Sequence, residues 1–228
     1  MRWLARLFCL VCAAPALACE DPICEVPPDS LDFTRLIDFQ TFPSGYGVGR
    51  ALSGVVYGKG VRFGERFLGQ LLEIDTGHDH LVGRPLPPLT LLAGEDGSNL
   101  GTISLWGDNV LKGHGPRGFP DAGAVGEGSI AALFDRDQPA LALDIRGGEG
   151  GTVTLVFFDR TGAPIHSLRK QVDRDTGTLT LLRRGALPDI AGFTVENADP
   201  EGLGIDNLRF EFHELMGARP LPDRARRG

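Results

Sequence analysis

Two carboxylates, Glu73 and Asp75, have residue types and a spacing that could support chemistry. They lie at the end of a strand-like run that starts at Phe67, and alternate residues of a strand share one face. A retaining glycosidase needs two such carboxyl groups, as nucleophile and helper. The simpler interpretation is a strand end that leads into a polar loop.

The stretch Glu73-Ile-Asp75-Thr-Gly-His78 resembles the Glu-x-Asp-x-x-Glu motif that laminarinase-like glycosidases carry on a jelly-roll strand. The last position of that motif would supply the acid/base glutamate, and here it is His78. The resemblance therefore implies polysaccharide hydrolysis by Glu73 and Asp75 as an alternative function, with an incomplete set of carboxylates.

The segment from Asp75 to His80 is the densest group of potential metal ligands in the chain. His78 and His80, with Asp75 or Asp79, could bind zinc or copper through imidazole nitrogen and carboxylate oxygen. Such sites usually recruit ligands from separated segments, and the sequence identifies no others. We therefore prefer a solvated loop here.

Aromatic residues suggest a second chemistry, the stacking of a sugar. Trp106 could form such a platform with His114 and Arg117, although a half-buried tryptophan of the core is the simpler interpretation.

The run Gly45-Tyr-Gly-Val-Gly49 looks like a phosphate loop, but no helix follows it to hold an anion. We interpret that run as a glycine-rich turn.

The elements that would position these residues are strands. Between Gln138 and Phe212, apolar residues alternate in runs separated by Gly- and Asp-containing turns, which predicts an antiparallel β-sandwich of jelly-roll type with negligible helix. The expected core residues are Leu141, Leu143, Ile145, Val153, Leu155, Phe157, Leu179, Leu181, Phe193, Leu208 and Phe210. A chain of 228 residues fits one such domain.

The N-terminus has the pattern of an export signal over residues 1–18. Arg2 and Arg6 precede an apolar run that is too short to span a bilayer, which needs about 20 residues, and Ala16-Leu-Ala18 has the form of a cleavage site. We expect a secreted or periplasmic protein without a transmembrane segment once the signal is removed. The net charge of −7 argues against nucleic acid as a partner.

Cys19 and Cys24 would remain after cleavage. In an oxidising compartment an even pair predicts a small disulfide loop, within a linker that we expect over residues 19–35. The alternative is lipidation of Cys19, because Ala16-Leu-Ala-Cys19 vaguely resembles a lipoprotein cleavage box. The sandwich would then cover residues 36–212, followed by a disordered basic tail at 213–228.

Ile37-Asp-Phe39 near the start and Gly204-Ile-Asp-Asn-Leu-Arg-Phe210 near the end resemble secreted bacterial β-sandwich domains. Many of these relatives carry a C-terminal sorting anchor that begins Val-Pro-Glu-Pro, and this chain lacks one. The resemblance implies a carbohydrate-binding-module-like domain, and several such domains hold a structural calcium where the first and last strands meet.

Asp38, Asp206 and Asn207 are the oxygen donors at the matching places in this chain. The apolar spacing slips between Ile205 and Leu208, which indicates a β-bulge that could turn a carboxylate inward. We therefore expect a calcium site there, the alternative being a polar step on an exposed strand face.

The sequence favours an exported binding domain for a carbohydrate or an envelope component, without catalysis. A laminarinase-like glycosidase and a structural or adhesive envelope protein are the alternatives.

Overall fold

The computed structural model describes residues 19–174 and 177–212, which form an all-β structure with antiparallel pairing between its strands. The fold class predicted from the sequence, an antiparallel all-β domain, is confirmed, while the jelly-roll type stays a prediction. The predicted signal at 1–18 and the predicted tail at 213–228 lie outside the described residues.

The strands are β1 (Ile23–Val26), β2 (Phe33–Ile37), β3 (Arg50–Ala51), β4 (Val56–Gly58), β5 (Val61–Gly64), β6 (Arg66–Phe67), β7 (Leu71–Asp75), β8 (His78–Val82), β9 (Leu91–Leu92), β10 (Leu100–Leu105), β11 (Asp108–His114), β12 (Val125–Gly128), β13 (Ile130–Gln138), β14 (Ala140–Arg146), β15 (Thr152–Phe158), β16 (Pro164–Gln171), β17 (Thr178–Arg183), β18 (Ile190–Asn197) and β19 (Gly204–Phe212). Three short 3-10 turns, η1 (Pro28–Ser30), η2 (Ala122–Ala124) and η3 (Arg184–Ala186), are the helical elements of the described residues.

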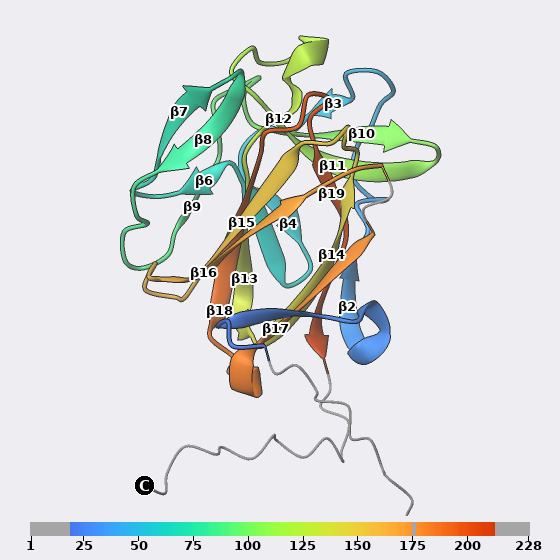
Figure 1. Cartoon of the computed structure of the whole chain (residues 1–228). Helices are drawn as coiled ribbons and strands as arrows, with labels where there is room; N and C mark the ends of the chain where they lie inside the picture. Colours follow the sequence, from blue (N-terminus) through green and yellow to red (C-terminus); the bar gives the residue numbers. More distant parts are fainter. Residues whose placement is uncertain (1–18, 175–176, 213–228) are drawn as a thin grey trace, which may run out of the picture.

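Two large sheets carry the fold (Figure 1). The nine-stranded sheet has the order β1-β17-β14-β19-β11-β10-β3, with β12 paired to β11 and β2 paired to β19. The six-stranded sheet has the order β16-β15-β18-β13-β5-β4. Two small two-stranded sheets, β6-β9 and β7-β8, complete the structure.

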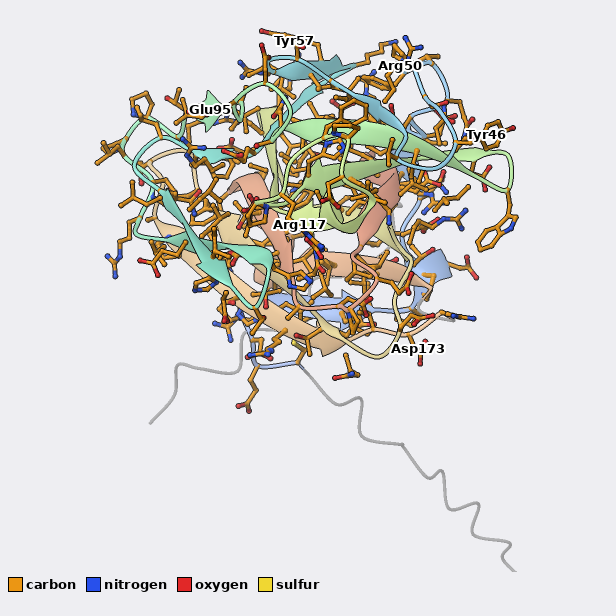
Figure 2. All side chains as sticks on the ribbon, turned by 90° about the horizontal axis from the view of Figure 1, so that it is seen from above. Tyr46, Arg50, Tyr57, Glu95, Arg117 and Asp173 are labelled. Atoms are coloured by element: carbon orange, nitrogen blue, oxygen red, sulfur yellow. A yellow bond between two sulfur atoms is a disulfide. The ribbon has the colours of Figure 1, made fainter. Side chains whose placement is uncertain are left out.

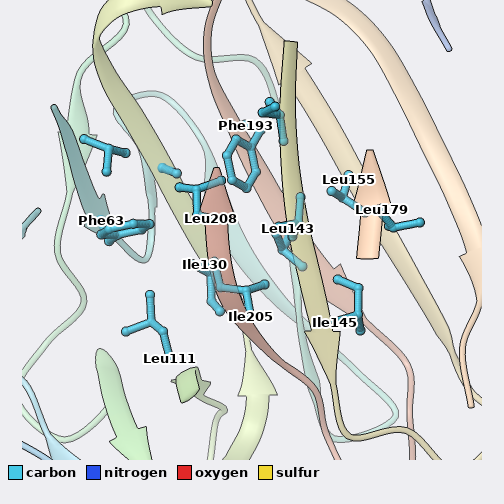
Figure 3. Packing of buried hydrophobic residues seen from close by; sticks show 14 of the residues in the cluster. Phe63, Leu111, Ile130, Leu143, Ile145, Leu155, Leu179, Phe193, Ile205 and Leu208 are labelled. Carbon is cyan, nitrogen blue, oxygen red and sulfur yellow. The ribbon is translucent and has the colours of Figure 1, made fainter. Parts of the chain in front are cut away.

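The main hydrophobic core lies between the facing sides of the two large sheets (Figure 3). Phe134 of the six-stranded sheet and Phe210 of the nine-stranded sheet have ring centroids 5.0 Å apart. All eleven core residues expected from the sequence are buried. Alternation identified them because each sheet has one face in this core.

The β15 strand is apolar on both sides near its end because it also borders a second, smaller core. Phe158 packs edge-on against Phe67 of β6, with ring centroids 5.6 Å apart. Gly64 permits this layer to approach, since a Cβ there would lie 2.4 Å from the carbonyl oxygen of Leu92. The outer side of the six-stranded sheet is therefore partly covered by β6, β9 and their loops.

The β-bulge expected near the C-terminus is confirmed on β19. The pairing with β14 shifts between Ala142–Arg209 and Asp144–Asp206, which leaves one extra residue on β19. Asn207 has a left-handed φ of 49° at this point. The bulge returns Leu208 to the core, while Asp206 stays opposite Asp144 and shares its outer face.

The domain boundary expected at residue 36 is wrong, because residues 19–35 are not a linker. β1 pairs with β17, and β2 begins at Phe33 and pairs with β19. Between them, the chain forms η1, which lies beside β2 at the lower right of Figure 1. No helix among the described residues is long and apolar enough to cross a membrane.

Candidate functional site

Trp106 is at the tip of the β10–β11 hairpin and is 97% exposed. Trp106 and Gly107 have φ values of 50° and 97°, so both turn residues adopt the left-handed conformation of a type I′ turn. Glycine and asparagine suit such positions, whereas a bulky side chain there is strained. The interpretation of Trp106 as a half-buried core residue is therefore wrong.

Tyr46 lies beside this hairpin and is 84% exposed. Its neighbour Gly45 forms a bridge with Ile103, and the Gly45 carbonyl accepts a hydrogen bond from the Ser104 N–H at 2.8 Å. Ser104 and Trp106 are two residues apart, which is about 7 Å along a strand. We call Tyr46 and Trp106 the aromatic corner. In Figure 2, Tyr46 points outward at the periphery of the molecule.

His114 and Arg117, expected to join Trp106, lie elsewhere. Leu100 pairs with Gly113, so His114 is at the opposite end of the hairpin from Trp106. The His114 ring is buried edge-on against Phe119, and Arg117 binds Glu127 at 2.8 Å. The three-residue platform is therefore not formed.

Asp144 organises a polar network on the outer face of the nine-stranded sheet. One carboxylate oxygen accepts the Thr178 hydroxyl at 2.6 Å and lies 3.3 Å from Nη1 of Arg209. The other oxygen accepts Nδ2 of Asn207 at 2.8 Å. Each partner comes from a strand adjacent to β14, so the sheet register assembles the network.

Asp206 continues this network toward the aromatic corner. Its side chain accepts a hydrogen bond from the Asn207 N–H at 2.7 Å and lies 3.8 Å from Nε of Arg146. Arg146 also donates to Asp108 at 2.9 Å, two residues beyond Trp106. Burial raises the pKa of Asp206 from 3.8 to about 6, against the opposing effects of the Asn207 N–H and Arg146. We call Asp108, Asp144, Arg146, Thr178, Asp206, Asn207 and Arg209 the outer-face network.

The calcium site at Asp38, Asp206 and Asn207 stays a prediction. Asp38 follows β2 and accepts a hydrogen bond from the Gln40 N–H at 3.2 Å. The guanidinium of Arg146 lies near both Asp206 and Asp108 and balances their negative charge. A metal ion at this position would have the same role. Across the described ranges, no group of three or more His, Cys, Asp or Glu side chains is arranged to hold a metal ion.

Glu73 and Asp75 are both exposed on β7, which pairs with β8 in a separate two-stranded sheet. Glu73 lies opposite His80 in this hairpin. Neither carboxylate belongs to the outer-face network.

The predicted loop around His78 and His80 is instead the start of β8, and the solvated-loop interpretation is wrong. His78 Nε2 lies 2.9 Å from the Asp199 carbonyl, and His80 Nδ1 lies 2.8 Å from the Glu196 carboxylate. Asp79 is buried and accepts the Ser129 N–H at 3.3 Å. Each of these three side chains contacts a different residue outside the β7–β8 hairpin, and together they hold the hairpin against the rest of the domain.

The predicted disulfide between Cys19 and Cys24 is present. It uses the Cys19 sulfur that lipidation would require. The bond ties Cys19 to Cys24, which lies within β1, and so helps to hold the N-terminal edge of the nine-stranded sheet.

Sequence reasoning missed Tyr46, Asp144 and Arg146 as site residues. Tyr46 was hidden in a glycine-rich turn, although a tyrosine between two glycines is itself a signal of exposure. Asp144 and Arg146 alternate with core residues on β14, and that alternation could have placed both on the outer face.

Comparison with known proteins gives no assignment. No family model matches the chain, and the searches of curated proteins and of solved structures found no match.

Proposed function

We propose that the chain is an exported, non-catalytic domain that binds a carbohydrate at the aromatic corner. The observation that carries this proposal is the exposure of Trp106, at 97%, in a strained turn position beside the exposed Tyr46. Neither the core nor the turn requires a tryptophan there. An exposed aromatic face can pack against the C–H face of a sugar ring and remove apolar area from water.

The outer-face network supplies polar groups next to the corner. Asp108 and Arg146 are close to Trp106 along the sheet, and sugar hydroxyls both donate to carboxylates and accept from guanidinium groups. The antiparallel scaffold holds these groups on paired strands, which favours a preformed binding surface.

Export is supported by the pattern of residues 1–18 and by the Cys19–Cys24 disulfide, which suits an oxidising compartment. A non-catalytic role is supported by the exposed positions of Glu73 and Asp75 on a separate hairpin.

A glycan array tests the proposal. The chain contains two tryptophans, Trp3 and Trp106, so protein produced from Cys19 onward reports on Trp106 alone through its fluorescence. We expect binding to at least one glycan, with a change in that fluorescence and loss of the signal in Trp106→Ala. Tyr57→Ala is the matched control, because Tyr57 is an exposed aromatic on β4 of the other large sheet.

Three results would overturn the proposal. Glycan binding that is equal in Trp106→Ala would place the ligand elsewhere, and release of reducing sugar that disappears in Glu73→Gln would favour the laminarinase-like alternative. A protein that binds no glycan would favour a structural or adhesive role in the envelope.

A further inference from the structure

Lys112 is almost completely buried and yet has no partner. It is next to the core residue Leu111 on β11, so its own side chain lies on the outer face of the nine-stranded sheet, where it is 7% exposed. Its amine makes no hydrogen bond and no ion pair with any residue in the described ranges. A buried lysine is normally paired, so this amine is available for another role.

Glycines make room for the Lys112 side chain. Lys112 pairs with Gly204 of β19, and a Cβ at Gly204 would lie 2.7 Å from Cγ of Lys112. A Cβ at Gly147, in the loop after β14, would lie 4.0 Å from Nζ of Lys112. The lysine therefore extends past Gly204 toward Gly147. Because Gly147 has no side chain, a small molecule can approach the amine from that side.

Two carboxylates act on the amine without binding it. One oxygen of Asp199 accepts the N–H groups of Glu149 and Gly151, both at 2.8 Å. The other oxygen accepts the Glu201 N–H at 3.1 Å. Asp199 is thus occupied by backbone groups, and the Glu201 side chain is exposed. The negative charges of both residues still reach Lys112 through space, and they favour a positive charge on its nitrogen.

Burial has the opposite effect and favours the neutral amine. Loss of hydration lowers the pKa of Lys112 from 10.5, and the charges of Asp199 and Glu201 offset only part of this change. A larger fraction of the amine is therefore neutral near physiological pH. A neutral, desolvated lysine amine is the form that attacks a carbonyl carbon.

We propose that Lys112 is a modification site, at which the amine condenses with a small aldehyde such as the open-chain form of a short reducing sugar. A C–N bond forms at the carbonyl carbon, and the carbonyl oxygen leaves as water with both hydrogens of the neutral amine. The condensation needs no oxidant. Protonation of the imine restores the positive charge that Asp199 and Glu201 favour, whereas acylation would remove it. The proposal does not depend on glycan binding at the aromatic corner.

Reaction of the full chain with glyceraldehyde, trapped by cyanoborohydride and mapped by peptide mass spectrometry, tests the proposal. The chain has three lysines, and two of them are internal controls: Lys59 is exposed, and Lys170 pairs with Glu25 at 2.6 Å. At about pH 7.5 we expect modification of Lys112 to be at least about threefold faster than that of either control, because more of its amine is neutral. This advantage should disappear in urea, where the chain is unfolded.

The pH dependence and two variants complete the test. The rate at Lys112 should reach half of its limit at a pH below 10.5. Lys112→Met should remove the fast reaction, whereas Lys59→Met should leave it unchanged. The comparison of the three lysines in the wild type needs no variant. Modification of Lys112 that is no faster than that of Lys59 in the folded chain would overturn the proposal, and so would an equal advantage in urea.

Discussion

Asp206→Asn tests the electrostatics of the outer-face network. Asp206 is 1% exposed, and burial raises its pKa from 3.8 to about 6. A difference of one in pKa corresponds to about 1.36 kcal/mol. Ionisation of Asp206 therefore lowers the stability of the folded state, relative to the unfolded chain, by roughly 3 kcal/mol. As pH rises from 3.8 to about 6, the unfolded chain releases this proton before the folded chain does, and stability falls.

Asparagine keeps the oxygen that accepts the Asn207 N–H but carries no charge. We therefore expect Asp206→Asn to raise the free energy of unfolding by up to roughly 3 kcal/mol at about pH 7.5, and to change it little at about pH 3.5, where Asp206 is protonated in the folded wild type and mostly protonated in the unfolded chain. The attraction to Arg146 is already contained in this figure, because it opposes the rise of the Asp206 pKa.

Urea denaturation of the wild type and the variant at both pH values measures this difference. Asp75→Asn, on the exposed β7 strand, is the control and should show no comparable pH dependence. The reasoning is refuted if Asp206→Asn shifts stability equally at both pH values, or lowers it near neutrality.

Three further substitutions test the packing and the N-terminal edge. Gly64→Ala should cost about 1–3 kcal/mol in urea denaturation, because its Cβ would meet the backbone of Leu92; an unchanged midpoint would contradict the close approach. Lys112→Met should raise the melting temperature near neutral pH, because burial lowers the pKa of this lysine, and a lower melting temperature would argue against that cost. Cys24→Ser should cost roughly 2 kcal/mol and make stability insensitive to reductant, whereas persistent sensitivity would exclude the Cys19–Cys24 bond as its source.

The sequence predicted the parts of the fold in which local pattern and burial coincide. Strands such as β14 alternate because one face meets the core, so Leu141 and Leu143 could be assigned without coordinates. The β-bulge was also visible, because an extra residue interrupts the apolar spacing before Leu208. Both the alternation and the β-bulge depend on a few neighbouring residues, so the local sequence was enough to predict them.

Features that depend on distant pairing were missed. β1 is four residues long and follows no alternation that distinguishes it from a linker; it is a strand because Ile23–Val26 pairs with β17, more than 150 residues later. Trp106 was misplaced because its apolar character suggests burial, whereas the pairing of Leu105 with Asp108 puts it in a turn.

Isothermal titration calorimetry with the glycan that the array selects tests the carbohydrate-binding proposal most directly. If Trp106 supplies the stacking surface, Trp106→Ala should lose roughly tenfold or more in affinity, Tyr46→Ala should also lose affinity, and the exposed Tyr57→Ala should bind like the wild type. Equal affinity in all four proteins would contradict a binding site at the aromatic corner.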